Sequence, residues 1–392
     1  MKSNRKKNFE KENNNKKPLE KKKKKNNKQS KENNSINCLN HKIKRTKNIT
    51  EENNNKINNL NPDKISFLKD LTDNAFSIGT NNTFTIFKSI NDILYLIYTD
   101  NKSIISYDMI DEKIINVIKN AHFFSIINFR HYLDKIAIID LLLSSDINSL
   151  KIWNIINLEC MTIINDINKN GFLFSACFLC NNKHQNYIIT SNYNVNNQID
   201  NSDPIKVYDF NGKKIKNINN SNEGIYIIDT YYDINMSKTF IVTGNDYYVK
   251  SYDYNLNKIY HIYLDENNKE NHINIIIDNT DEIVKLIEAS ENGIIRIWNF
   301  HSGIILSKLN FNVLINSICF WNTEYLFLGC RDKTIKLIDL RNKKILTNFK
   351  GHNDRVVTIK KVYHPKYGYC LVSQNLLKGK IKLWGNKYYN NK

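Results

Sequence analysis

The residues in this sequence with the most obvious chemical potential are its cysteines. Cys177 and Cys180 have the Cys-x-x-Cys spacing of a zinc ligand pair, but they lie in an apolar segment typical of a β-strand. Three positions apart on a strand, two side chains point to opposite faces, so the thiols cannot share a metal ion. The seven cysteines are odd in number and widely spaced. We expect reduced thiols, buried in apolar segments, in the cytosol or nucleus.

Sequence motifs for catalysis are missing. The chain has no GxxxxGK[ST] phosphate loop, no HExxH and no GxSxG, and its 12 glycines leave little backbone freedom for a nucleotide cradle. The histidines show no metal-ligand spacing. The sequence therefore predicts a protein that is not an enzyme, with no cofactor, no metal and no small-molecule substrate.

Positive charge is concentrated at the N-terminus. Residues 1–64 hold 20 Lys and Arg against 7 Asp and Glu, which accounts for +13 of the net charge of +18. Apolar side chains are too sparse there to offset the entropy of ordering, so we expect residues 1–63 to be a disordered Lys- and Asn-rich tail. The run Lys21 to Lys25 is typical of nuclear localisation or of nonspecific contact with nucleic acid through phosphates. An equally strong interpretation is that codon usage alone made this tail lysine-rich.

Two observations bear on the compartment. No apolar stretch follows the N-terminal charges as in a secretory signal, and the apolar run at 136–143 is too short to span a bilayer and is interrupted by Asp140. We therefore expect an intracellular protein with no membrane contact, and Lys21 to Lys25 favours the nucleus over the cytoplasm.

The elements that would position any functional residue form a repeat. A short strand-like segment recurs seven times, with the same position held by an aromatic residue in six copies and by isoleucine in one, at intervals of 40 to 55 residues. These intervals bracket the length of a four-stranded propeller blade. The marker residues are Tyr107, Trp153, Tyr208, Tyr252, Trp298, Ile338 and Trp384.

The sixth unit shows four strand-like runs most clearly: NSICFW, YLFLGC, TIKLID and KILTNF. Apolar residues occupy both faces of the third run, as expected when each sheet packs between two neighbours. We predict an all-β, seven-bladed β-propeller. A β-sandwich or barrel with evenly spaced strands is the alternative, although seven units of one period are hard to reconcile with it.

Residues 64–392 resemble the WD-repeat (WD40) family, most clearly at 329–359. This stretch contains Asp332 before the third strand, the pair Gly351 and His352, and Val356. The resemblance implies a hydrogen-bonded structural tetrad of His, Ser or Thr, Asp and Trp within a blade, which stabilises the blade only when every polar group is paired. Many tetrad positions have changed here. The remaining candidates are His122, His272, His352, Asp246, Asp332, Trp153, Trp298 and Trp384.

The ends of the chain predict how the ring closes. After Trp384 too few residues remain for a fourth strand, whereas 64–71 (KISFLKDL) alternates like a strand and has no partner of its own. As in the family, we expect this segment to be the outermost strand of the last blade, because an open ring would expose unpaired strand edges. The predicted domains are therefore the tail, 1–63, and the propeller, 64–392.

Three surfaces are candidates for partner contact. Asp339 and Arg341 follow the sixth third-strand and are similar to the Trp-Asp-x-Arg box of WD-repeat ubiquitin-ligase receptors, although Ile338 replaces the Trp and such basic residues are commonly plain loop charges. Tyr231 and Tyr232 would suit an interface, and core packing explains them equally well. The Asn-rich insertion at 192–203 fits disordered polar padding better than a binding loop.

The function predicted from these observations is a noncatalytic, protein-binding scaffold within a larger intracellular complex. Two alternatives remain open: a subunit of a nuclear RNA-processing or ribosome-assembly particle, and a substrate receptor of a cullin-type ubiquitin ligase. Fold alone does not decide among them, and the sequence identifies no partner.

Overall fold

The structure is a computed structural model, and it describes residues 64–77, 82–134, 137–165, 171–181, 185–194, 205–218, 224–245, 247–265 and 272–389. The predicted tail, 1–63, lies outside the described residues, as do most of the 192–203 insertion and Asp246. The propeller is described below by itself.

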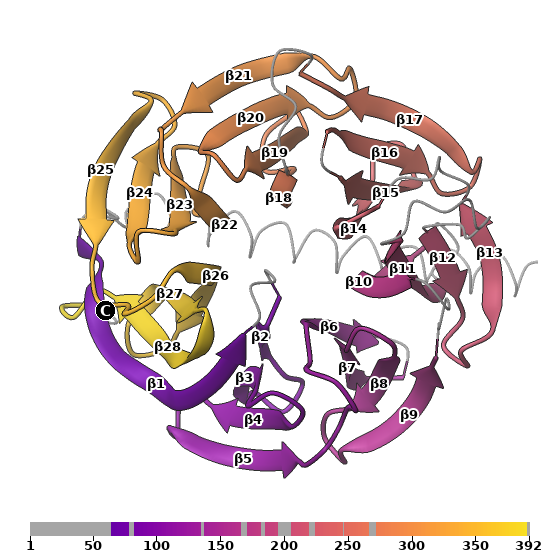
Figure 1. The fold of residues 1–392 in the computed structure, drawn as a ribbon, viewed down its shortest axis with the longest axis horizontal. Coiled ribbons are helices and arrows are strands. Elements are labelled where there is room, and N and C mark those ends of the chain that lie inside the picture. Colours follow the sequence, from indigo (N-terminus) through magenta and orange to yellow (C-terminus); the bar gives the residue numbers. More distant parts are fainter. Residues whose placement is uncertain are drawn as a thin grey trace, which may run out of the picture. The chain divides into compact units, whose positions relative to one another are not determined.

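Seven four-stranded antiparallel sheets form a ring, as Figure 1 shows, so the predicted seven-bladed β-propeller is confirmed. In blades 1 to 6 the strands follow one another from the channel to the circumference in chain order. The strands are β1 (Ser66–Ser77), β2 (Phe84–Lys88), β3 (Leu94–Thr99), β4 (Ile104–Asp108), β5 (Lys113–Ile118), β6 (Asn128–Asp134), β7 (Ile139–Ser145), β8 (Leu150–Asn154), β9 (Glu159–Ile164), β10 (Gly171–Cys180), β11 (Asn186–Asn194), β12 (Ile205–Tyr208), β13 (Lys214–Ile218), β14 (Ile227–Asp233), β15 (Lys238–Gly244), β16 (Val249–Asp253), β17 (Lys258–Tyr263), β18 (His272–Asp278), β19 (Lys285–Ser290), β20 (Ile294–Asn299), β21 (Ile305–Asn310), β22 (Ile315–Phe320), β23 (Tyr325–Cys330), β24 (Ile335–Asp339), β25 (Lys344–Phe349), β26 (Val356–His364), β27 (Gly368–Asn375) and β28 (Leu377–Gly385). Blade 1 is β2–β5, blade 2 is β6–β9, and so on to blade 7, which contains β26, β27, β28 and β1.

Burial follows the position of a strand within its blade. The middle strands β3, β4 and β24 are buried along their whole length, whereas the outermost strand β5 is largely exposed. A middle strand packs against neighbouring blades on both sheet faces, so apolar residues on both faces stabilise it. This explains the continuous β-branched and aromatic runs that marked the repeat. The four runs expected in the sixth unit are strands β22 to β25.

The ring closes through the N-terminal strand, as expected. β1 pairs antiparallel with β28, with Phe67 opposite Trp384 and Ser66 opposite Gly385. Figure 1 shows this indigo strand at the circumference, beside the yellow β28. The strand continues to Ser77, well beyond the predicted end at residue 71, and it does so through three register irregularities that let it follow the curved edge.

Side-chain amides join the innermost strands of neighbouring blades. The Nδ2 of Asn128 donates to the carbonyl of Ala176 at 3.0 Å, and the Nδ2 of Asn316 donates to that of Val356 at 3.2 Å. Each bond links one blade to the next around the channel. The asparagines thus satisfy backbone acceptors that have no ladder partner at the inner edge.

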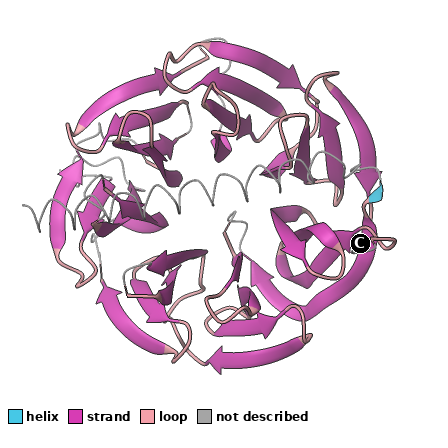
Figure 2. Ribbon diagram, turned by 180° about the vertical axis from the view of Figure 1, so that it is seen from behind, coloured by secondary structure: helices cyan, strands magenta, loops and turns pink. Residues whose placement is uncertain are grey.

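The loops form two faces, which Figures 1 and 2 view from opposite sides. The top face consists of the loops that precede each innermost strand and the loops between second and third strands. The bottom face comprises the loops between first and second strands and between third and fourth strands. In the described part of the chain, no helix is long and apolar enough to cross a membrane.

Candidate functional site

Blade 2 contains a complete polar tetrad. Trp153 Nε1 donates to Ser144 Oγ at 2.8 Å, and His122 Nε2 lies 2.7 Å from the same oxygen. On its other side His122 Nδ1 is 3.5 Å from Asp146 Oδ2, and Ser149 bridges the two. A neutral imidazole protonated on Nδ1 pairs every group: indole to hydroxyl, hydroxyl to Nε2, and Nδ1 to carboxylate.

The ionisation of this tetrad follows from burial. Burial lowers the pKa of His122 below its ordinary value, against the opposing effect of Asp146. Burial also raises the pKa of Asp146, but hydrogen bonds from His122 and from the backbone of Asn148 and Phe124 outweigh it and lower that pKa. A neutral histidine therefore donates to an ionised carboxylate, which fits the geometry.

Blade 7 contains three quarters of the same arrangement. His352 Nε2 lies 2.6 Å from Ser373 Oγ, which accepts a hydrogen bond from Trp384 Nε1 at 2.7 Å. Burial, and then the charge of Lys382, lowers the pKa of His352 to about 4. Gly351 has φ of +149°, and a Cβ there would lie 3.2 Å from the Trp384 ring. Glycine thus lets the loop pass over the indole and deliver His352.

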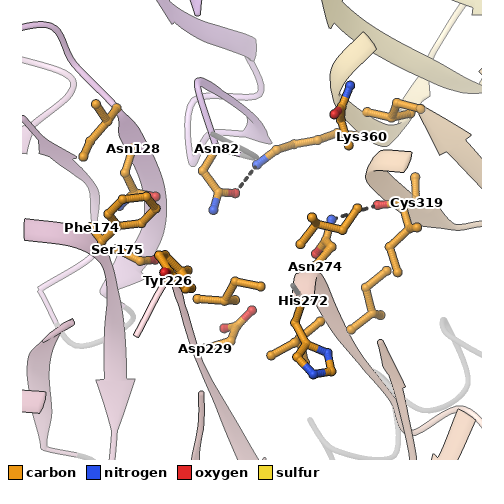
Figure 3. A pocket seen from close by; sticks show the side chains of 18 of the residues that line it. Asn82, Asn128, Phe174, Ser175, Tyr226, Asp229, His272, Asn274, Cys319 and Lys360 are labelled. Atoms are coloured by element: carbon orange, nitrogen blue, oxygen red, sulfur yellow. Dashed lines mark hydrogen bonds between the residues drawn. The ribbon is translucent and has the colours of Figure 1, made fainter. Parts of the chain in front are cut away.

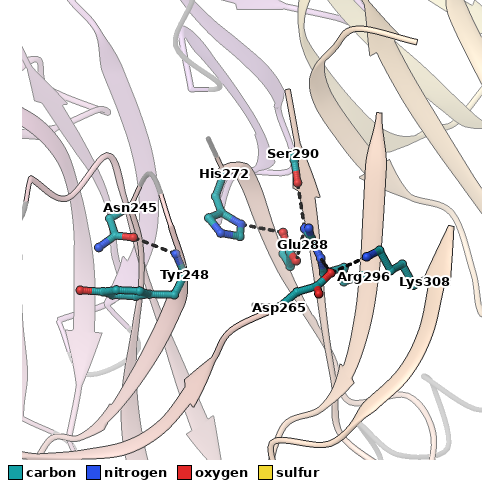
Figure 4. Close-up of polar contacts among 8 residues, drawn as sticks. All are labelled: Asn245, Tyr248, Asp265, His272, Glu288, Ser290, Arg296 and Lys308. Carbon is teal, nitrogen blue, oxygen red and sulfur yellow. Dashed lines mark hydrogen bonds and ion pairs between the residues drawn. The ribbon is translucent and has the colours of Figure 1, made fainter. Parts of the chain in front are cut away.

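Blade 5 contains a network of charged side chains in place of the tetrad (Figure 4). Glu288 stands directly opposite Arg296, where blade 2 has Ser144 opposite Lys151. His272 Nδ1 lies 2.6 Å from Glu288, and Arg296 reaches Glu288 at 3.0 Å and Ser290 at 2.9 Å. The structure therefore places His272 in a buried charge network and not with Trp298, whose Nε1 is buried without a hydrogen-bond partner.

The charge network of blade 5 continues to the loop before it. Arg296 Nε donates to Asp265 Oδ2 at 2.8 Å, and Lys308 reaches the same oxygen at 2.6 Å. Burial lowers the pKa of Arg296, but Glu288 and Asp265 more than compensate and raise it. Glu288 and Arg296 are each about 1% exposed. Charges this deeply buried are tolerated only because each one is paired.

Of the two remaining tetrad aspartates only Asp332 is described, and it does not join a histidine. Asp332 accepts hydrogen bonds from Thr334 in its own turn and pairs with Lys336 at 2.7 Å. Asp246 lies outside the described residues, and the neighbouring turn is closed by Asn245, which accepts from the backbone of Tyr248 (Figure 4). Asp332 in blade 6 and Asn245 in blade 4 thus each stabilise a local turn.

The candidate contact residues have distinct surroundings. Asp339 is buried and accepts from the backbone of Asn342 at 2.8 Å; that bond is the main reason its pKa is lowered. Arg341 pairs with Glu324 at 2.8 Å, with 72% of its side chain exposed.

The tyrosine candidates lie on β14. Tyr231 packs edge-on against Phe300 in the core between blades 4 and 5, and burial, followed by Asp233, raises its pKa to about 12. Tyr232 is 36% exposed. The two side chains thus have different accessibility, although they are adjacent in the chain.

Sequence reasoning missed the serines and the acids that complete these networks. Asp146 was missed because the turn of blade 2 has one more residue, which places the aspartate seven positions before Trp153 and not six. Ser144 and Ser373 follow no rule based on spacing to the tryptophan. Glu288 had a usable signal, since a carboxylate within a buried strand predicts a cationic partner nearby.

Four of the six described cysteines, Cys177, Cys319, Cys330 and Cys370, are buried as expected of core thiols, whereas Cys160 and Cys180 are only partly buried. Cys177 is buried in the apolar cluster between blades 3 and 4, where burial raises its pKa, and the Sγ of Cys180 lies 3.7 Å from the carbonyl of Asn181. Among the described residues, no group of three His, Cys, Asp or Glu side chains could hold a metal ion.

A cavity of about 930 Å³ lies in the upper part of the central channel (Figure 3). Its walls come from innermost strands, with apolar side chains such as Phe174 and Tyr226 beside Lys360, Arg130 and Asp229. Figure 3 shows Lys360 extending toward Asn82, with Asp229 pointing into the same space. A concave site with an apolar lining and a few convergent polar groups is typical of ligand binding.

The bottom face exposes large apolar side chains. Among the described residues of its loops, four large apolar side chains from blades 2, 4 and 5 are more than 60% exposed: Ile138 at 65%, Ile234 at 76%, Leu256 at 61% and Ile304 at 64%. His301, beside Ile304, pairs with Asp233, beside Ile234, at 2.9 Å, so the loops of blades 4 and 5 meet. Apolar groups gathered on one face are typical of a protein-binding surface.

Comparison with known proteins gives a limited likeness. No protein-family model matches the chain. A stretch of 111 residues is 27% identical to the U3 small nucleolar RNA-associated protein 21 homolog of Schizosaccharomyces pombe. The match covers 28% of this chain and 12% of that protein.

Proposed function

We propose that this protein is a divergent WD-repeat propeller that acts as a noncatalytic protein-binding scaffold in an intracellular ribosome-assembly particle. The observation that carries the scaffold role is the bottom face, where exposed isoleucine and leucine side chains project from the loops of several blades. A rigid ring supports these loops, and rigid support lowers the entropy cost of binding.

Support for the WD-repeat assignment comes from the tetrads of blades 2 and 7. Both join histidine, serine and tryptophan as the family resemblance implies, and blade 2 adds the aspartate. Support for the ribosome-assembly setting comes from the likeness to a U3 small nucleolar RNA-associated protein. A basic N-terminal segment would suit a nuclear particle rich in RNA.

The test is affinity purification of the tagged full chain from nuclear extract, followed by mass spectrometry and measurement of U3 small nucleolar RNA. A triple variant, Ile234→Asp, Leu256→Asp and Ile304→Asp, should lose its protein partners. The matched control is Met161→Asp with Ile163→Asp on the outermost strand β9, where the two side chains are 51% and 53% exposed. Partners retained by the triple variant would exclude the bottom face, and absence of U3 RNA would exclude the proposed particle.

A further inference from the structure

The channel cavity holds a lysine, Lys360, that forms no ion pair with any residue in the described part of the chain. Lys360 lies on β26, and its Nζ has one hydrogen bond, a long one of 3.4 Å to the Oδ1 of Asn82. None of the ion pairs formed among the described residues includes Lys360. An ammonium group in a confined space without a counterion is costly, so it favours any anion that enters.

A second cation in the same cavity is only partly satisfied. Arg130, on β6, has its Nη2 3.8 Å from Asp229 Oδ2 and 3.4 Å from the carbonyl of Ile228. Its Nε is buried and has no hydrogen-bond partner. Both Arg130 and Lys360 line the cavity, and the charge of Arg130 helps to lower the pKa of Lys360.

The charges in this part of the cavity fix the kind of ligand. When Lys360 is protonated, it and Arg130 carry two positive charges, and Asp229 carries one negative charge. Lys361 also lines the cavity, but its ammonium donates to the carbonyl of Trp321 at 2.6 Å. Arg331 and Glu291, at the top rim, pair with each other and cancel. One positive charge remains, which a single carboxylate would neutralise. The surrounding apolar side chains, including Phe174 and Ile318, would then contact the body of the ligand.

We propose that the upper channel binds a carboxylate attached to an apolar chain, with Lys360 and Arg130 as its partners. The apolar chain is a peptide segment that ends in the carboxylate, because the cavity is far larger than the charged group alone. This site is separate from the bottom face, so it extends the proposed scaffold role.

The protonation of Lys360 makes binding depend on pH. Burial, and then Arg130, lowers its pKa to about 7, while Asp229 and Cys319 oppose that shift. A carboxylate binds the ammonium form, and that form is lost as the pH rises through 7. Between pH 6.5 and 8.5 the affinity should fall more than about tenfold.

The experiment is calorimetric titration of the full chain with two peptides, acetyl-Gly-Phe-Leu and its C-terminal amide, and with hexanoate. The acid peptide should bind and the amide should not. Lys360→Met should weaken binding of the acid at least tenfold. The matched control, Lys350→Met, removes the same charge from an exposed loop lysine and should leave binding unchanged.

Each outcome of this titration supports or overturns the proposed carboxylate site. Equal binding of acid and amide, or equal loss in both lysine variants, would overturn the proposal, as would failure of every probe to bind. Binding of hexanoate without the peptide would also overturn the proposal, because the ligand would then be a small acid and not a peptide. The melting temperature of Lys360→Met should not fall, because the substitution removes a desolvated charge, and this shows that lost binding is not lost folding.

Discussion

Blades 2 and 5 differ in how they pair the polar side chain buried in their second strand. Blade 2 uses neutral partners, and blade 5 uses charged ones. At the equivalent position of the second strand, blade 2 has Ser144 and blade 5 has Glu288. A histidine reaches that residue in both blades: His122 from the loop before β6, and His272 from the first position of β18. Blade 2 satisfies its tryptophan through a serine hydroxyl and a neutral imidazole. Blade 5 leaves Trp298 Nε1 unpaired and neutralises Glu288 with Arg296.

The difference teaches that the blade frame accepts different sets of polar residues, and even an unpaired indole, provided that every buried charge has a partner. A neutral network contributes a modest, separable stabilisation. A charged network contributes little net stability but makes each deeply buried member indispensable, because removal of one leaves another charge buried. The two blades should therefore respond very differently to single substitutions.

The largest effect is expected in blade 5. Arg296→Met leaves Glu288 without its main partner in the core, and it should lower the free energy of unfolding by about 3–5 kcal/mol. Urea unfolding, followed by tryptophan fluorescence, would measure it. Lys308→Met is the control: Lys308 pairs with the same Asp265 but is 37% exposed, so the loss should stay below about 1 kcal/mol. Equal losses would mean that Arg296 contributes no more than a surface charge.

The histidine of blade 7 should make stability depend on pH. The pKa of His352 is about 4 in the folded protein and about 6.5 when unfolded, so the unfolded state binds its proton first. The stabilisation by neutral His352 is fully present above about pH 6.5. As the pH falls from there to about 4, the free energy of unfolding drops by roughly 3 kcal/mol. Unfolding midpoints at several pH values, compared with those of His352→Gln, would reveal it. Parallel pH profiles of the two proteins would contradict this assignment.

Loss of one hydroxyl in blade 2 should cost less. Ser144→Ala removes the partner shared by Trp153 and His122, which should destabilise the protein by about 1–3 kcal/mol. The adjacent Ser145 offers a matched control, because its Oγ is equally buried yet has no hydrogen-bond partner. Ser145→Ala should change the unfolding midpoint very little. If the two alanine variants behave alike, the tetrad of blade 2 has no special role.

The smallest change is expected when blade 5 is given the chemistry of blade 2. Glu288→Ser combined with Arg296→Lys replaces the buried ion pair by the serine and lysine found at Ser144 and Lys151, and Asp265 keeps Lys308 as a partner. The stability should stay within about 1.5 kcal/mol of the parent, since whole pairs exchange more cheaply than single charges. Trp298 fluorescence should change as its Nε1 gains an acceptor; an unfolded double variant would show that the charges themselves are required.

Much of the fold could be predicted because it rests on local signals repeated seven times. Marker residues such as Trp153 and Trp384 do occupy equivalent third strands, and the segment at 64–71 does close the ring. The polar networks could not be predicted as completely. Asp146 was hidden by one additional turn residue, and the partner of His272 depends on strand register, which spacing along the chain does not encode.

The proposed carboxylate site in the channel could not be predicted from the sequence for a related reason. Arg130 lies on β6 of blade 2 and Lys360 on β26 of blade 7, and neither has a motif around it. Only closure of the ring brings them to one cavity. Residues that meet across a closed ring carry no signal in any single repeat, whereas those within one blade do.

The closing strand also has a consequence for synthesis on the ribosome. Asp70 of β1 binds Lys382 of β28, 312 positions later in the chain, so β1 emerges early and must wait for the last blade before it can pair. Through most of translation the nascent protein has an open seam with two unpaired strand edges. Contacts between segments so far apart in sequence are slow to form, and exposed edges attract other chains. Chaperone engagement should therefore be strongest just before β28 leaves the exit tunnel.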